Sequence, residues 1–112
     1  MVVCKGVDEE EVEPLDVTDT FMPGEKAYTL AHFINEKGRM AECELWKYER
    51  GEGYSLFSDD IYSSTVDSNK HNFWSWKKIR EEGNYRFVWK LDGKIRMMEE
   101  FKVDDGEMVA SE

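Results

Sequence analysis

The side chains best suited to metal binding or nucleophilic chemistry in this sequence are two histidines and two cysteines. His32 and His71 are far apart in the chain, and neither has a Cys or a second His at zinc-ligand spacing. Zinc requires three or four nitrogen or sulfur ligands in a tetrahedral arrangement. Cys4 lies near an acidic run and Cys43 in a run of alternating apolar residues, so we expect no disulfide between them. These four residues predict structural or surface roles and no metal site.

Acidic residues offer a second kind of chemistry. Ser58-Asp59-Asp60 and the pair Asp16 and Asp19 carry oxygens that calcium accepts, but neither run has the spaced ligands and glycine of a calcium loop. The sequence has no Gly-x-Ser-x-Gly elbow, no glycine-rich phosphate loop and no distinctive carboxylate pair. We therefore expect no catalytic residues, no cofactor and no enzymatic activity.

The elements that position these side chains are predicted to be strands. Short runs rich in aromatic and β-branched residues alternate with turn residues, which indicates an all-β domain. A chain of 112 residues suffices for one such domain with one core. No apolar stretch is long enough for a transmembrane helix, so no membrane insertion is expected. The eight expected strands span residues 17–22, 26–34, 39–49, 54–57, 61–66, 72–77, 84–90 and 94–103.

The net charge of −10 is concentrated at the two ends of the chain. Residues 1–16 carry −5 and residues 104–112 carry −4, which leaves residues 17–103 nearly neutral. Acidic runs with few large apolar residues cannot offset the entropy of ordering. We therefore predict an acidic flexible leader over 1–16, the folded domain over 17–103 and an acidic flexible tail over 104–112. With no basic stripe to bind phosphates, nucleic acid is not an expected partner.

The last two predicted strands form a hairpin whose turn is inferred from side-chain alternation. Tyr85, Phe87 and Trp89 share one face of the first strand, and the matching apolar set on the second consists of Ile95, Met97, Phe101 and Val103. A two-residue Asp92-Gly93 turn would set Trp89 opposite Arg96. A three-residue loop ending at Gly93 sets Trp89 opposite Ile95 and Phe87 opposite Met97, so we predict the three-residue loop.

Upstream of this hairpin, Trp74-x-Trp76-x-x-Ile79 is followed by Gly83-Asn84-Tyr85-Arg86-Phe87. The pattern resembles the tyrosine corner of immunoglobulin-like and fibronectin type III-like sandwiches. The resemblance implies an antiparallel immunoglobulin-like β-sandwich of about eight strands, with the Tyr85 hydroxyl bonded to the preceding turn. It also implies that Trp74, Trp76, Ile79, Phe87 and Trp89 are core residues. Phe87 stands where an antibody domain has its second cysteine, so the resemblance does not extend to the inter-sheet disulfide.

Alternation also predicts one exposed surface. In the third strand Ala41, Cys43 and Leu45 share a face, which leaves Glu42, Glu44, Trp46 and Tyr48 on the opposite face. The resemblance sets this strand beside the strand of Tyr85, so acidic and basic outward residues would be neighbours. Aromatic residues and Arg surrounded by charge are typical of a partner-binding face. The predicted binding residues are Trp46, Tyr48, Arg86, Val88, Arg96 and Met98.

Trp46 admits two interpretations. Strict alternation places it outward, whereas a bulge in the third strand would turn it inward as the core tryptophan that the resemblance implies. The function expected from the outward interpretation is a non-catalytic protein-binding, assembly or accessory module that binds a protein partner or itself. An alternative is a carbohydrate-binding module, with Tyr54, Phe57, Tyr62 and Phe73 as candidate stacking rings. A metal-dependent module is a third class.

Overall fold

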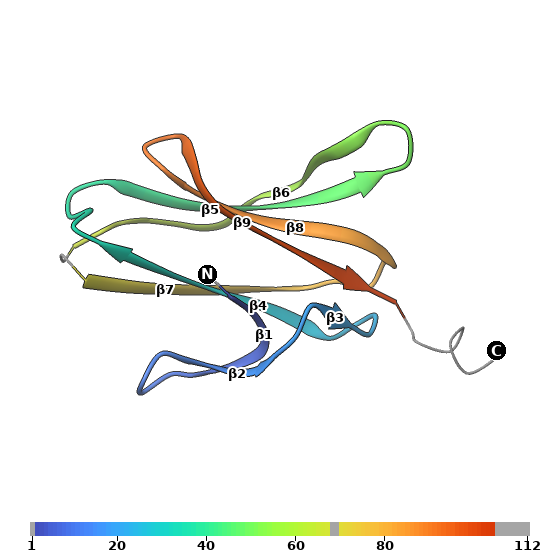
Figure 1. The fold of residues 1–112 in the computed structure, drawn as a ribbon, viewed down its shortest axis with the longest axis horizontal. Coiled ribbons are helices and arrows are strands. Elements are labelled where there is room, and N and C mark those ends of the chain that lie inside the picture. The colour runs from blue at the N-terminus through green and yellow to red at the C-terminus, as the bar shows by residue number, and fades with distance from the viewer. Residues whose placement is uncertain (1, 68–69, 105–112) are drawn as a thin grey trace.

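The computed structural model describes residues 2–67 and 70–104, and these residues form nine β-strands and no helix. The strands stack as two layers, which are seen edge-on in Figure 1. No helix long and apolar enough to cross a membrane occurs in the described part of the chain. In chain order the strands are β1 (Val2–Asp8), β2 (Glu13–Val17), β3 (Thr20–Phe21), β4 (Lys26–Ile34), β5 (Met40–Glu49), β6 (Gly53–Thr65), β7 (Lys70–Lys78), β8 (Gly83–Leu91) and β9 (Lys94–Val103).

One sheet has four strands in the order β2-β1-β4-β7, and the other has five in the order β3-β9-β8-β5-β6. All neighbouring strands run antiparallel except β3, which pairs in parallel with β9. The prediction of an all-β sandwich is therefore confirmed. Three hairpins extend beyond the layers: β5–β6 and β8–β9 rise on one side, and β1–β2 descends on the other (Figure 1).

The N-terminal segment differs from the sequence prediction, because residues within the predicted flexible leader form β1 and β2. Val3 pairs with Thr29 of β4 and belongs to the core, and Cys4 is fully buried. The acidic residues that suggested flexibility are concentrated at the turn, where Asp8 Oδ1 accepts hydrogen bonds from the backbone N–H groups of Glu10 and Glu11. In the predicted tail, Asp104 N–H donates to the Phe21 carbonyl at 2.9 Å, and residues 105–112 lie outside the described part.

Strand β6 joins two segments that were predicted as separate strands. The expected turn at Ser58-Asp59-Asp60 lies within this strand. Pairing with β5 continues on both sides of it, from Tyr48 opposite Tyr54 to Cys43 opposite Tyr62. The register shifts between Cys43 and Trp46, so β6 carries extra residues there as a bulge. Polar residues at a bulge in an edge strand resemble turn residues in sequence, which accounts for the difference.

The β8–β9 hairpin also differs from its prediction. Leu91 pairs with Lys94, which leaves a two-residue Asp92-Gly93 turn with positive φ at both residues, as a type I′ turn requires. A bulge then shifts the register, so that Trp89 lies opposite Met97 instead of Arg96. Ile95 pairs with Lys90 and is exposed, not part of the core face as predicted.

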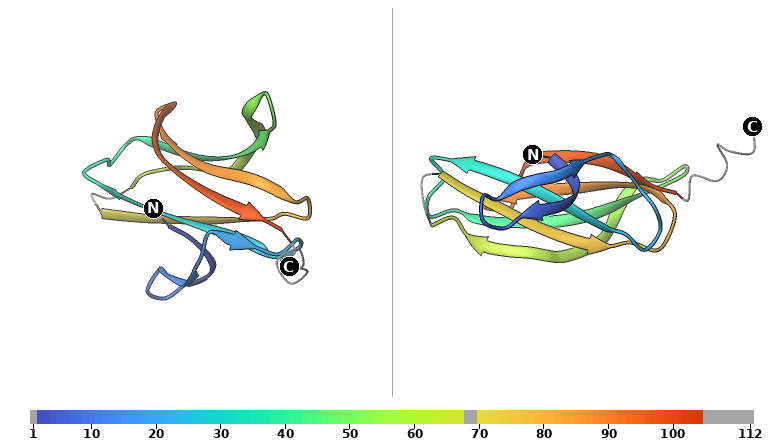
Figure 2. Two further views of the ribbon diagram at one scale, coloured as in Figure 1. Left: turned by 45° about the vertical axis from the view of Figure 1, so that its right-hand side comes forward. Right: turned by 90° about the horizontal axis from the view of Figure 1, so that it is seen from below.

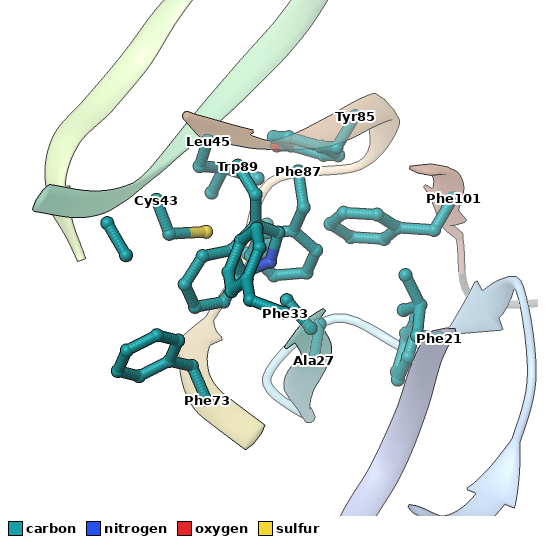
Figure 3. Close-up of a cluster of buried hydrophobic side chains, with 14 of the residues drawn as sticks. Phe21, Ala27, Phe33, Cys43, Leu45, Phe73, Tyr85, Phe87, Trp89 and Phe101 are labelled. Atoms are coloured by element: carbon teal, nitrogen blue, oxygen red, sulfur yellow. The ribbon is translucent and has the colours of Figure 1, made fainter. Parts of the chain in front are cut away.

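Aromatic rings dominate the core between the sheets (Figure 3). Phe87 and Phe101 stack with ring centroids 4.9 Å apart, and Tyr85 stacks on Phe101 at 5.7 Å. The Tyr85 hydroxyl donates to the Glu81 carbonyl oxygen at 2.6 Å, which confirms the predicted hydrogen bond to the preceding turn. Trp89 is fully buried, and its Nε1 donates to Thr29 Oγ1 of the opposite sheet at 2.9 Å.

Trp74 and Trp76, predicted as core residues, lie on the outer face of the four-stranded sheet. Over residues 72–78 of β7, where side-chain burial is described, Phe73 and Ser75 are buried, and Ile79 continues their alternation. Trp76 pairs with Tyr28 of β4 and is 42% exposed. The odd spacing between each tryptophan and Ile79 explains the difference, since residues an odd number of steps apart in a strand face opposite sides. Ile79 and Phe73 share the inner face.

The hydrogen bond between the sheets predicts a specific stability loss. Thr29→Val keeps the side-chain shape but leaves the Trp89 N–H buried without an acceptor, which should lower the free energy of unfolding by about 1–3 kcal/mol. Thr29→Ser keeps the acceptor and should be the more stable of the two variants. Urea denaturation monitored by tryptophan fluorescence measures both, and equal stabilities would contradict a role for this bond.

The tyrosine corner predicts a stability change at alkaline pH. Burial, followed by the negative charges of Glu81 and Glu49, raises the pKa of the Tyr85 hydroxyl from its usual 10.0 to about 12. Because the folded state holds this proton more tightly, its stabilising effect is complete below pH 10 and is lost as the pH rises towards 12. Tyr85→Phe should therefore show a smaller loss of unfolding free energy than wild type between these pH values. Identical pH profiles would refute this assignment.

A candidate binding face on the five-stranded sheet

The predicted binding residues come from three adjacent strands of the five-stranded sheet. Strand β5 pairs with β8 as expected, with Trp46 opposite Arg86 and Glu44 opposite Val88. Strand β9 lies on the far side of β8, where Met98 is opposite Val88. The inward neighbours Leu45 and Phe87 are fully buried, so the outward residues form the solvent side of the sandwich.

Trp46 takes the outward position that strict alternation predicted. Its pairing with Arg86 on one side and Leu56 on the other keeps it on the outer face, despite the bulge between β5 and β6. The side chain is half-buried, and its Nε1 donates to Glu44 Oε1 at 3.1 Å. The interpretation of Trp46 as the core tryptophan is therefore wrong, and Trp89 occupies the centre of the core instead.

Arg86 is the best-positioned cation of the face. Its guanidinium carbon lies 3.9 Å from the centroid of the Tyr54 ring, and its Nη2 lies 2.7 Å from Glu100 Oε1. Tyr54 in turn contacts Tyr48 with ring centroids 5.5 Å apart. Stacking and an ion pair together hold a planar guanidinium in one orientation. The Arg86 Nε is buried and, among the described residues, has no hydrogen-bond acceptor.

Two of the six predicted residues do not contribute as expected. Val88 is only 2% exposed, because its short side chain lies between the longer Met98 and Glu44 on the neighbouring strands. Arg96 is exposed, but its Nη2 lies 2.7 Å from Glu36 Oε1 in the loop after β4, at the margin of the face. This contact is the main cause of the lowered pKa of Glu36.

The exposed apolar residues of the face include two that the sequence analysis missed. Met98 is 50% exposed and Tyr48 42%, as predicted for an open surface. Leu56 beside Trp46 is 45% exposed, and Ile95 near the β8–β9 turn is also exposed. Leu56 alternates with Tyr54 in the sequence, so pairing that segment with β5 would have identified it. The exposure of Ile95 could be predicted only with knowledge of the bulge in the β8–β9 hairpin, which alternation alone does not reveal.

The face borders a groove of about 420 Å³ near the β5–β6 hairpin. The two hairpins β5–β6 and β8–β9 both curve away from the four-stranded sheet, one at each end of the face (Figure 2, left). The face is therefore bounded at both ends by chain rather than being flat. The groove is lined by Asp19, Thr20, Tyr48, Tyr54, Asn84, Glu100, Phe101 and Lys102.

Charges on this face are largely paired with one another. Lys90 Nζ lies 3.0 Å from Glu44 Oε1, the same oxygen that accepts the Trp46 hydrogen bond. Together with the Arg86–Glu100 pair, this contact places basic side chains beside acidic ones, as predicted. The face is thus nearly neutral locally, although the whole chain carries −10. Two such faces, or this face and an apolar partner, can approach without strong repulsion.

The groups with nucleophilic or metal-binding chemistry lie elsewhere. Cys4 and Cys43 are free thiols without solvent exposure, and burial raises the pKa of each. No cluster of three His, Cys, Asp or Glu side chains suited to a metal ion occurs among the residues that the structure describes. Of the four candidate stacking rings, Phe73 is buried and Tyr62 packs against the core, so these four do not form one exposed platform.

Comparison with models of protein families and with curated proteins gives no match to this chain. Inferences about its function therefore rest on its own residues. The sandwich has two outward faces, the one on the five-stranded sheet and the outer face of the four-stranded sheet.

The buried thiols predict slow chemical labelling. Because burial excludes reagents and disfavours the thiolate, neither Cys4 nor Cys43 should react with a water-soluble disulfide reagent in the native protein at pH 8. Both should react rapidly in 6 M guanidinium chloride, as about two thiols per chain. Fast labelling of one thiol without denaturant would show that its segment opens in solution.

Proposed function

We propose that this domain is a non-catalytic protein-binding or assembly module that uses the outer face of the five-stranded sheet. The observation that carries the proposal is the group of exposed apolar side chains, Tyr48, Leu56 and Met98, around a fixed arginine. Contiguous apolar surface is costly on a monomer, and Tyr, Met and Arg are enriched in interfaces. Arg86 is already oriented by Tyr54 and Glu100, so it loses little rotamer freedom on binding.

The internal ion pairs support an apolar partner or a second copy of the chain. A strongly charged partner would have to displace Glu44 from Lys90 or Glu100 from Arg86, both within 3.0 Å. An apolar partner leaves these pairs in place as a polar rim around Tyr48, Leu56 and Met98. Rims of this kind exclude water and contribute specificity more than affinity.

We also propose that the sandwich is immunoglobulin-like or fibronectin type III-like in topology. The pairing of β4 with β7 and the order β5-β8-β9 correspond to the B–E pair and the C-F-G order of that fold. The Tyr85 hydrogen bond near the start of β8 supports the same assignment. Domains of this class commonly serve as recognition or spacer modules, which agrees with a binding role. An experimental structure with another strand order would remove this proposal.

The proposed face can be tested with charge insertions at exposed positions. Met98→Lys and Leu56→Lys place an unpaired charge in the apolar group, and both sites are about half exposed, so the fold should be retained. Each variant should shift self-association measured by sedimentation velocity, or the affinity for an identified protein partner, at least about tenfold. Trp46→Ala should weaken the same association without unfolding the domain.

Val17→Lys provides the matched control, because Val17 is 63% exposed but lies on β2 of the other sheet. It should behave as wild type in every binding assay. Association that weakens equally in Val17→Lys and Met98→Lys would show a general charge effect. A wild-type chain that stays monomeric, with partner binding unchanged in Met98→Lys and Leu56→Lys, would refute the proposed face.

A further inference from the structure

The outer face of the four-stranded sheet carries an aromatic group that the core does not use. Tyr28 lies between Trp74 and Trp76, with ring centroids 6.2 Å and 6.4 Å away and ring planes tilted by 37° and 41°. The residues between them along the strands, such as Thr29 and Ser75, face inward and are buried. Three large rings therefore lie side by side on the solvent side of a sheet whose inner side is already packed.

The rings begin a strip that becomes polar along the strands. The register of β4 with β7 sets Tyr28 opposite Trp76, Leu30 opposite Trp74 and His32 opposite Asn72. His32 Nδ1 and Asn72 Oδ1 are hydrogen-bonded to each other at the polar end. The strip thus combines aromatic faces with a planar amide and an imidazole, which can donate and accept hydrogen bonds.

A hollow of about 170 Å³ lies at the polar end of this strip. The β1–β2 hairpin descends beside the outer face of the four-stranded sheet (Figure 1) and provides one wall of the hollow. Its lining is mainly apolar apart from His32 and Asn72, and it consists of Val2, Pro14, Leu30, Ala31, His32 and Asn72. A ligand that extends along the rings can therefore place one end in a recess.

The charge of the surroundings selects the class of ligand. The turn of the same hairpin carries Asp8, Glu9, Glu10 and Glu11, which disfavour an anionic ligand nearby. At the aromatic end of the strip Lys26 pairs with Lys78 of β7, and the Lys26 ammonium lies 4.3 Å from the Trp76 ring centroid, over the ring. With carboxylates on the hairpin turn and ammonium groups at the aromatic end, neither a polyanion nor a polycation suits the whole strip. A neutral ligand with apolar faces and polar edges fits best. Sugar rings have this character, with C–H groups on their faces and hydroxyls at their edges.

We infer that the outer face of the four-stranded sheet binds a neutral oligosaccharide. Sugar rings stack on Trp74, Tyr28 and, once the long Lys26 side chain moves aside, Trp76, and the hydroxyls of a terminal sugar bond to His32 and Asn72 at the hollow. The tilt between neighbouring rings suits a single twisted chain better than a flat crystalline surface. This site is independent of the protein-binding face, which lies on the opposite outer side of the sandwich.

The probes are neutral hexasaccharides of β-1,4-linked glucose, xylose, mannose and N-acetylglucosamine, with polygalacturonate and a proline-rich peptide as contrasting ligands. Titration calorimetry with the full chain should show saturable binding of at least one neutral hexasaccharide and none of polygalacturonate. The same hexasaccharide should change the tryptophan fluorescence. If no neutral hexasaccharide binds, or if only polygalacturonate or the peptide binds, the inference is overturned.

Variants assign the binding to these rings. Trp76→Ala should weaken binding at least about tenfold, because a stacked ring is lost, and it should fold because Trp76 is substantially exposed. Trp74→Tyr keeps a ring and should weaken binding less than Trp74→Ala. Asn72→Ala should weaken binding without altering the melting temperature by more than a few degrees.

Met98→Lys on the opposite sheet is the matched control and should bind the hexasaccharide as wild type does. Binding that survives in both Trp76→Ala and Trp74→Ala would place the sugar elsewhere and overturn the inference. Because Met98→Lys tests the protein-binding face and Trp76→Ala tests the sugar site, failure of one proposal is distinguishable from failure of the other.

Discussion

The buried hydrogen bond from Trp89 to Thr29 connects the two sheets at the centre of the core. Trp89 also contacts Phe33 and Phe73 of the four-stranded sheet and Tyr62 of β6, with ring centroids 5.5–6.2 Å away. A tryptophan N–H in an apolar core requires an acceptor, and Thr29 is the residue that supplies it. This requirement fixes which residues of β4 and β8 face inward, and alternation then determines both outer faces.

Much of the fold could be predicted from alternation, because each strand buries one side. The inward set Tyr85, Phe87 and Trp89 was identified correctly, and so was the neighbourhood of β5 and β8. Alternation determines which residues share a side, but not which side is inner. In β7 the family resemblance placed the two tryptophans on the inner side, whereas Phe73 and Ser75 occupy it. The odd spacing from each tryptophan to Ile79 was the one feature of the sequence that indicated the outer side for the tryptophans.

Local irregularities were the second limit of the sequence analysis. In the β8–β9 hairpin, a two-residue turn followed by a bulge restores the same facing as a three-residue loop, so alternation cannot separate them. Four of the six predicted face residues, Trp46, Tyr48, Arg86 and Met98, lie on the face with some exposure. The exposure of Val88 was predicted wrongly, because the burial of a residue on an outer face depends on how long its cross-strand neighbours are. Those neighbours are known only once the strand register is known.

The acidic N-terminal segment shows why charge averaged over a segment is a weak guide to order. Val3 and Cys4 are buried, whereas most of the carboxylates lie at one turn, where they stay in contact with water and need not be desolvated. An average over 1–16 mixes these two environments. The same hairpin then has two consequences for the four-stranded sheet: Pro14 and Val2 help to form the hollow, and the turn of the hairpin carries Asp8, Glu9, Glu10 and Glu11. Order in this segment is therefore a precondition for the proposed sugar site.

The two outer faces differ in how their polar groups are satisfied. On the five-stranded sheet, Glu44 pairs with Lys90 and Glu100 pairs with Arg86. A partner therefore contacts apolar side chains that are surrounded by charges already paired with one another. On the four-stranded sheet, the polar end consists of an imidazole and an amide beside a hollow, so a ligand with its own hydroxyls can exchange hydrogen bonds there. Because the faces lie on opposite sides of a packed core, occupation of one leaves the other accessible. Trp89 and the rings packed on it are the contacts through which binding at one face could affect the other, because they join the two sheets.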